Sequence, residues 1–187
     1  MNDFDELLRK ARENGKPTID GLFEMLYPEL RVAVRNCVGS GRAGQPVHPT
    51  ELLGEAFLRL RRRPGSYWKD KKHFILTVAR AVRFALVDTL HDEAVLRLQR
   101  QGLERVTMTL VGSEPPLPPE RLMDLHLALE RLRQEREALR RGGEVIELQF
   151  FAGYRREEIA EVLGISTRQV LRDFTATRLM LRKEIGF

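Results

Sequence analysis

Residues 155–183 read RREEIAEVLGISTRQVLRDFTATRLMLRK, and this stretch decides the fold of the C-terminal half. Apolar residues recur at helical spacing from Ile159 to Leu163, which predicts a short helix with its apolar face turned inward. Gly164 then supplies the backbone freedom of a tight turn, and Ser166 suits the N-cap of the next helix. A small alanine in the first helix and an apolar Val170 four residues after the cap complete the helix-turn-helix pattern.

The second predicted helix presents a polar and largely basic face to solvent. The residues that we assign to this DNA-contacting face are Thr167, Arg168, Gln169, Leu171, Arg172, Thr175 and Arg178. The N-terminal half of such a helix enters a major groove, where Arg168 and Arg172 reach guanine edges or phosphates. Arg178 lies later in the helix and fits a phosphate contact. The alternative is an ordinary helical hairpin with a solvated basic face.

Upstream of this motif, apolar residues follow a period of 3.6, so the predicted fold class is all-α. Helices are expected near residues 20–33, from Pro49 to the Pro64 breaker, and over 71–90, and a long helix is expected from Leu122 to Gly142-Gly143. Four of the nine prolines fall within 112–119, where the missing amide hydrogens prevent a helix. The predicted organisation is an N-terminal extension (1–17), a helical domain (18–95), a Pro-rich linker (96–119) and a helix-turn-helix domain (120–187).

The charge of the chain is concentrated in two segments. The 187 residues carry 32 Lys and Arg against 27 Asp and Glu. Residues 61–83 hold eight cations and one acid, and residues 167–183 hold five cations and one acid, which suggests two contacts with a polyanion such as nucleic acid. The apolar stretches are far shorter than the roughly 20 residues that span a bilayer, and a single cysteine, Cys37, excludes an internal disulfide. A soluble, cytoplasmic protein is therefore expected.

The motif and its neighbours resemble a known family. Residues 145–181, VIELQFFAGYRREEIAEVLGISTRQVLRDFTATRLML, look like the C-terminal domain of extracytoplasmic-function (ECF) sigma factors of bacterial RNA polymerase. The segments LYPELR (26–31), HPTELLGEAFLRL (48–60) and VARAVRFALVD (78–88) are similar to the N-terminal domain of one subgroup. The likeness covers about residues 20–90 and 120–185 in matching order, so it extends over most of the chain.

This resemblance implies a promoter-specificity subunit that binds and melts DNA without chemistry, cofactor or metal of its own. The implied −35 contacts are the residues of the second helix given above. The implied −10 contacts are Lys72, Arg80 and Arg83, and the implied polymerase contacts are Glu51, Leu52 and Glu55. Trp68 and Phe74 are expected in the core, because the domain has few aromatic residues to fill it. The implied partners are core RNA polymerase, promoter DNA, and an anti-sigma factor or a Ser/Thr kinase acting at Thr50.

Two departures from the family pattern keep alternatives open. Asp92 and Glu93 stand where cations are usual, and phosphate would repel them; Leu171 replaces a usual basic residue and could touch a thymine methyl. One alternative is therefore a sigma-like interaction protein that opens no promoter. Another is a conventional helix-turn-helix regulator. An enzyme is disfavoured, because the four histidines are scattered and Cys37 has no base nearby in sequence.

Overall fold

A computed structural model of the chain describes residues 6, 8–9, 19–38, 48–62, 68–99 and 119–186. These residues form helices and contain no strand, which confirms the predicted all-α class. The helices are α2 (Ile19–Val38), α3 (Pro49–Arg61), α4 (Lys71–Gln99), α5 (Pro119–Leu132), α6 (Glu137–Phe151), α7 (Arg156–Leu163) and α8 (Thr167–Ile185). None of them combines the length and apolar character that crossing a membrane requires.

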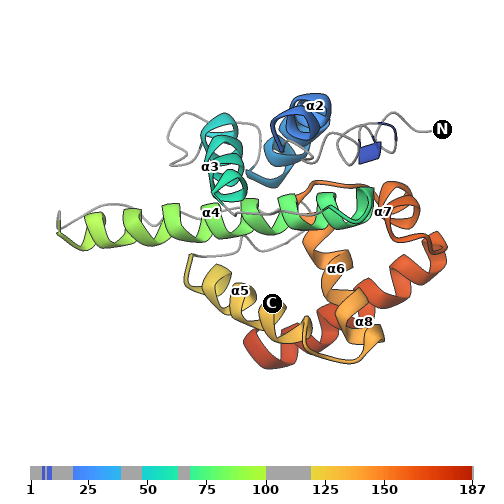
Figure 1. Cartoon of the computed structure of the whole chain (residues 1–187). Helices are drawn as coiled ribbons and strands as arrows, with labels where there is room; N and C mark the ends of the chain where they lie inside the picture. The colour runs from blue at the N-terminus through green and yellow to red at the C-terminus, as the bar shows by residue number, and fades with distance from the viewer. Residues whose placement is uncertain are drawn as a thin grey trace.

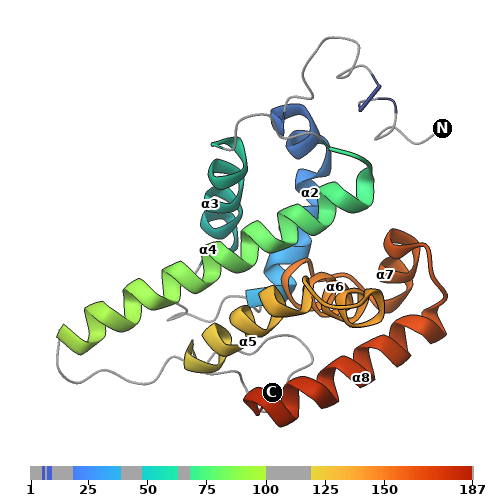
Figure 2. The ribbon, with the colours of Figure 1, turned by 60° about the horizontal axis from the view of Figure 1, so that its bottom comes forward.

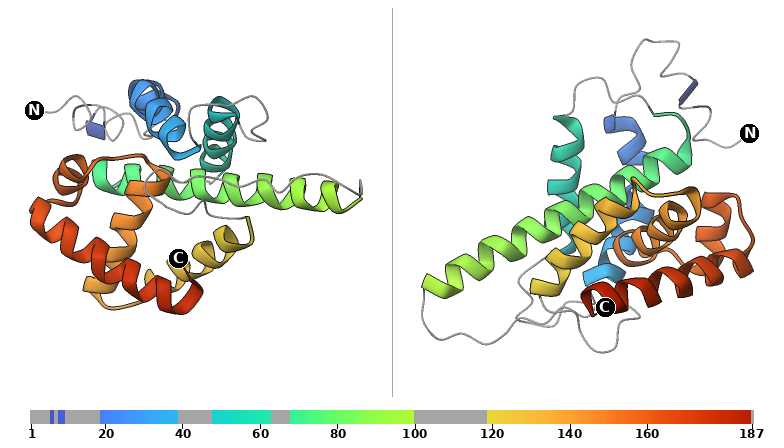
Figure 3. Two further views of the ribbon diagram at one scale, coloured as in Figure 1. Left: turned by 180° about the vertical axis from the view of Figure 1, so that it is seen from behind. Right: turned by 90° about the horizontal axis from the view of Figure 1, so that it is seen from below.

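Helix α4 runs through the middle of the molecule (Figure 1). The helices α2 and α3 lie on one side of it, α5, α6 and α8 lie on the other, and α7 lies beside one end of α4. The rotated view shows α5 running beside α4, with α8 further out (Figure 2). The views from behind and from below agree that α8 is an outer helix of the C-terminal half (Figure 3). Much of α8 is exposed to solvent, including Arg168, Leu171, Arg172, Thr175 and Arg178.

The boundaries of the N-terminal helices follow the sequence signals with one difference. Helix α3 has proline at its N-terminus and ends at Arg61, before the Pro64 breaker, as predicted. Helix α4 continues past Leu90, its predicted end, to Gln99, because no glycine or proline interrupts the chain there. The backbone at 92–93 is helical, but the side chains of Asp92 and Glu93 lie outside the described residues. Residues 100–118, most of the predicted linker, lie outside them too.

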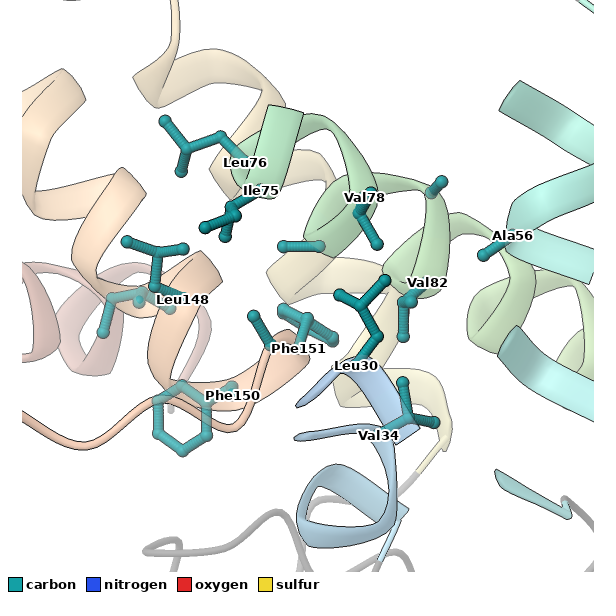
Figure 4. Close-up of a cluster of buried hydrophobic side chains, with 14 of the residues drawn as sticks. Leu30, Val34, Ala56, Ile75, Leu76, Val78, Val82, Leu148, Phe150 and Phe151 are labelled. Atoms are coloured by element: carbon teal, nitrogen blue, oxygen red, sulfur yellow. The ribbon is translucent and has the colours of Figure 1, made fainter. Parts of the chain in front are cut away.

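The buried side chains of both halves form one hydrophobic core. The close-up shows Leu30 of α2, Val82 of α4 and Phe151 of α6 gathered at one place (Figure 4). Residues from either side of the predicted linker thus exclude water from the same volume, and burial of apolar area is the main stabilising contribution there. The two predicted domains therefore pack against each other. Trp68 and Phe74 are buried, which confirms their assignment to the core.

The prediction that one long helix ends at Gly142-Gly143 is wrong. Helix α5 ends at Leu132, and both glycines lie inside α6. They serve close packing: a Cβ added at Gly142 would overlap Thr177 Oγ1 of α8 and lie 3.1 Å from Thr177 Cβ. A Cβ at Gly143 would lie 3.3 Å from Leu132 Cβ of α5. These two positions allow α6 to approach both of its neighbours.

Candidate nucleic-acid interface

The two C-terminal helices meet at the turn that the sequence predicts. Gly164 ends α7 in the left-handed conformation, with φ of 65°, and this conformation favours glycine. The amide of Ile165 donates to the carbonyl of Ala160 at 3.0 Å, which closes the turn. Ser166 is the N-cap of α8, and its hydroxyl accepts from the Gln169 amide at 3.2 Å. The cap and the turn glycine are therefore confirmed as local geometry.

The start of α8 displays the predicted DNA-contacting residues on the surface. The exposed members are Thr167, Arg168, Leu171, Arg172, Thr175 and Arg178, and Gln169 is half-buried. Leu171 exposes 44% of its surface between the two arginines. Val170 and Leu181 are buried against the rest of the C-terminal half. The structure thus places cations and one apolar side chain on the same open end of the helix.

One acid on the inner side of α8 is held by a neighbouring helix. Asp173 is 7% exposed and accepts from Nε of Arg141 in α6 at 2.6 Å. The same carboxylate accepts from Gln169 Nε2 at 2.6 Å. The hydrogen bond that Arg141 donates to Asp173 raises the pKa of Arg141, so its guanidinium stays charged. The negative charge of Asp173 is therefore neutralised inside the protein and is not displayed beside Arg168 and Arg172.

The cations of α4 that were assigned to −10 contacts lie against the C-terminal half. Arg83 is completely buried. Its Nε donates to Glu147 of α6 at 3.0 Å, and its Nη2 donates to Glu130 of α5 at 2.6 Å. Lys72 pairs with Glu144 at 3.2 Å, and Arg80 lies 4.0 Å from Glu130. In this arrangement Arg83 is closed off from any ligand, and its assignment to DNA stays a prediction that requires the two halves to separate.

A histidine and two aromatic rings complete the surroundings of Arg83. Its Nη1 lies 2.7 Å from Nδ1 of His126 in α5, so Nδ1 must be the unprotonated acceptor of a neutral ring. Burial and the charge of Arg83 lower the pKa of His126 and keep it neutral. The guanidinium also lies 5.3 Å from the Phe84 ring centre and 5.9 Å from that of Phe151. We call Arg80, Arg83, His126, Glu130 and Glu147 the Arg83 cluster.

The carboxylates of the Arg83 cluster sit in unequal environments. Glu147 is 5% exposed, and desolvation raises its pKa despite the neighbouring Arg83. Glu130 is half-buried; desolvation opposes its ionisation, but hydrogen bonds from Arg83 and Arg133 outweigh it and lower its pKa. Removing one partner of a buried ion pair leaves an uncompensated charge, so such clusters are sensitive to single substitutions.

The acids assigned to polymerase lie on an open face of α3. Glu51 and Glu55 are exposed and four residues apart, so they share one side of the helix. Leu52 is 1% exposed and belongs to the core, so its side chain does not reach the surface that a partner would touch. A groove of about 510 Å³ lies beside them between α2 and α3. Its lining includes Phe23, Tyr27, Thr50 and Phe57.

A second cleft, of about 850 Å³, separates the start of α4 from the loop between α6 and α7. Its lining carries both signs of charge, with Lys71 and Arg155 as well as Glu29 and Glu158. Burial, reinforced by nearby glutamates, raises the pKa of Tyr154 in the cleft, so its phenol stays protonated. No group of three or more metal-ligating side chains occurs among the described residues.

Sequence reasoning missed the acids that hold the basic side chains. Glu147 stood out in VIELQFF as an acid between apolar residues, and burial of such an acid demands a partner. The partner, Arg83, is 64 residues away, and helical periodicity cannot reveal a pairing at that distance. Asp173 carried a weaker signal: it is the one acid among the basic residues 167–183, next to a predicted core position, Phe174.

Comparison with known proteins adds one finding to this geometry. A family model described as ECF sigma factor matches residues 1–186. The match includes α3, the Arg83 cluster and the α7–α8 pair. No curated protein and no solved structure gives a significant match.

Proposed function

Because this chain belongs to the ECF sigma factor family, and so has a role in transcription initiation, we propose that it selects promoters through the exposed start of α8. In this proposal the surface that meets the −35 element consists of Thr167, Arg168, Gln169, Leu171, Arg172, Thr175 and Arg178. The observation that carries it is the exposure of Arg168 and Arg172 on a capped helix where the nearby acid, Asp173, is paired with Arg141 inside the protein. Such a surface attracts DNA and aims two guanidinium groups at the groove.

The proposed −10 contacts require a change of arrangement. Lys72, Arg80 and Arg83 lie on one helix, and cations of this kind follow the backbone of melted DNA. The three acids that pair with them, Glu130, Glu144 and Glu147, come from the C-terminal half. We expect the halves to separate on core polymerase, so that DNA phosphates replace these carboxylates. The predicted division into 18–95 and 120–187 belongs to this proposal.

The proposed polymerase surface consists of Glu51 and Glu55 together with the groove between α2 and α3. Thr50 is exposed in the first turn of α3 and lines that groove. A phosphate there would be favoured by the N-terminal end of the helix dipole and would add negative charge beside Glu51. Control by a kinase at Thr50 is thus a proposal, and it predicts that Thr50→Ala lowers promoter activity in cells while purified, unphosphorylated proteins perform equally.

The direct test is in vitro transcription with core polymerase and a promoter library. The proposal expects specific initiation by the wild type, and loss of upstream-element preference in Arg168→Ala and Arg172→Ala. Charge reversal in Glu51→Lys/Glu55→Lys is expected to weaken polymerase binding without changing that preference. Polymerase binding with no initiation on any promoter would instead favour a sigma-like interaction protein. Specific binding to duplex DNA without polymerase would favour a conventional regulator.

A further inference from the structure

A chain of hydrogen bonds connects the interior of the C-terminal half to the proposed reading surface. It begins at Arg141 of α6, whose Nε lies 2.6 Å from one oxygen of Asp173 and whose Nη2 lies 3.5 Å from the other. The second oxygen also accepts from Gln169 Nε2 at 2.6 Å. At the far end, the Oε1 atom of Gln169 accepts a hydrogen bond from Nη2 of Arg172. Four side chains are thereby joined in series.

The direction of the Gln169 amide follows from the first two members. An aspartate paired with an arginine is ionised, and an ionised carboxylate only accepts hydrogen bonds. The amide group of Gln169 must therefore turn its NH₂ toward Asp173 and its oxygen outward. An outward oxygen is an acceptor, and the guanidinium of Arg172 carries only donors. The buried acid thus determines which group Gln169 offers to its exposed neighbour.

The hydrogen bond to Gln169 restrains the side chain of Arg172, and Arg168 lacks such a restraint from the residues that the structure describes. Arg168 is exposed and makes no hydrogen bond or ion pair with the described part of the chain, so its long side chain keeps its rotamer freedom. Reading a guanine requires two parallel hydrogen bonds from one guanidinium, and this geometry benefits from a side chain held in place before binding. A contact with phosphate requires less direction.

We propose that Asp173 and Gln169 are positioning residues that hold Arg172 for a guanine edge, and that Gln169 makes no base contact of its own. The inference rests on the proposed function of α8 as the −35 reader. It narrows the sequence prediction, which placed Gln169 among the DNA-contacting residues.

The test uses the full chain in complex with core polymerase and a library randomised across the upstream element. The variants are Arg172→Ala, Gln169→Met and the double variant Gln169→Met/Arg172→Ala. Methionine keeps the length and helix propensity of glutamine but removes both hydrogen bonds. Gln134→Met, an exposed position in the turn after α5, is the matched control. Thermal unfolding of each variant shows whether the fold is retained.

Arg172→Ala is expected to reduce preference for G at one position by about 5- to 150-fold, the usual worth of one bidentate contact. Gln169→Met is expected to reduce preference at that same position by a few-fold, because Arg172 is then no longer oriented. The double variant is expected to equal Arg172→Ala, since a positioning residue has no effect without the residue that it positions. Gln134→Met is expected to match the wild type.

Three results would overturn the proposal. In the first two, Gln169→Met leaves the base preference of the upstream element unchanged, or changes it at a different position from Arg172→Ala. In the third, Arg172→Ala lowers activity equally at all upstream sequences. The first shows that the restraint is irrelevant, the second that Gln169 reads a base itself, and the third that Arg172 contacts phosphate. Failure of the underlying function has another signature. In that case Arg168→Ala and Arg172→Ala both leave promoter selection unchanged, whatever Gln169→Met does.

Discussion

Arg83 carries a full positive charge without access to solvent, and its partners make this burial tolerable. Moving a charge out of water costs several kcal/mol unless hydrogen bonds and opposite charges replace the lost hydration. Arg83 obtains this replacement from Glu147, Glu130 and His126. Because these partners come from α5 and α6, the cost of burying Arg83 is offset only while the two halves are in contact.

Arg83→Met therefore isolates the contribution of this one side chain. Methionine retains the apolar stem but leaves Glu147 buried without the guanidinium that donates a hydrogen bond to it. We expect the free energy of unfolding, measured in urea, to fall by about 3–5 kcal/mol, as for other broken buried pairs. Arg59→Met is the control, because Arg59 and its partner Asp88 are both partly exposed. The control is expected to change stability by less than about 1 kcal/mol. Equal losses in both variants would contradict this account.

At the scale of elements, the spacing between α6 and α8 depends on Gly142. A side chain there meets Thr177, which is buried, and lies 3.4 Å from the backbone oxygen of Asp173. Backbone cannot move aside as a flexible side chain can. The separation of α6 and α8 also sets the reach of Arg141 to Asp173, so packing and the proposed reading surface depend on the same glycine.

Gly142→Ala is expected to lower the free energy of unfolding by about 1–3 kcal/mol, the usual cost of overpacking a core. Thermal or urea unfolding measures it. Gly54→Ala in α3 is the matched control, because a Cβ at Gly54 meets nothing within 4 Å. There the better helix propensity of alanine is expected to stabilise the protein by up to about 1 kcal/mol. Destabilisation by both substitutions would show that the Thr177 contact is not the cause.

The elements were predictable from the sequence to the extent that their signals are local. Proline at the start of α3, the Ser166 cap and the Gly164 turn are encoded within a few residues, and each lies where expected. Gly142 led to the wrong prediction of a helix end, because a glycine that ends a helix and a glycine that lets another helix approach look alike in one sequence. The burial of Arg83 could not be predicted from the sequence either, since it depends on acids 47 and 64 residues away.

At the scale of the whole molecule, the two halves share a core and the Arg83 cluster. His126 is the imidazole of this cluster, and an imidazole has an ordinary pKa of about 6.5. The charged groups that act on it are Arg83, Glu130 and Asp88. Burial and the charge of Arg83 lower its pKa, whereas the two acids oppose this shift. Protonation would remove the Nδ1 acceptor and place a second cation against Arg83. Acid is therefore expected to weaken the contact between the halves.

The direction in which pH changes the folding stability follows from the linkage between protonation and folding. Because the pKa of His126 is lower in the folded chain than in the unfolded one, the unfolded chain takes up the proton first as the pH falls. This contribution to stability is complete above about pH 6.5 and is lost progressively below it. Glu147 changes the stability in the opposite direction as the pH falls, because its raised pKa means that protonation favours the folded state. The contribution of His126 to the pH dependence is therefore obtained by comparing two proteins that both contain Glu147 and differ only at residue 126.

His126→Asn supplies that comparison, because its Oδ1 atom can take the place of Nδ1 as acceptor and does not titrate. We expect the wild type to lose stability relative to His126→Asn between pH 7.5 and 5.5, measured by urea unfolding. The slope is expected to stay well below about 1.4 kcal/mol per pH unit, because His126 is half-exposed and solvent screens its neighbours. A wild type that gains on the variant as the pH falls would reverse the predicted sign. Since His126 joins α5 to α4, that result would also show that the neutral imidazole is not one of the contacts that stabilise the two halves against each other.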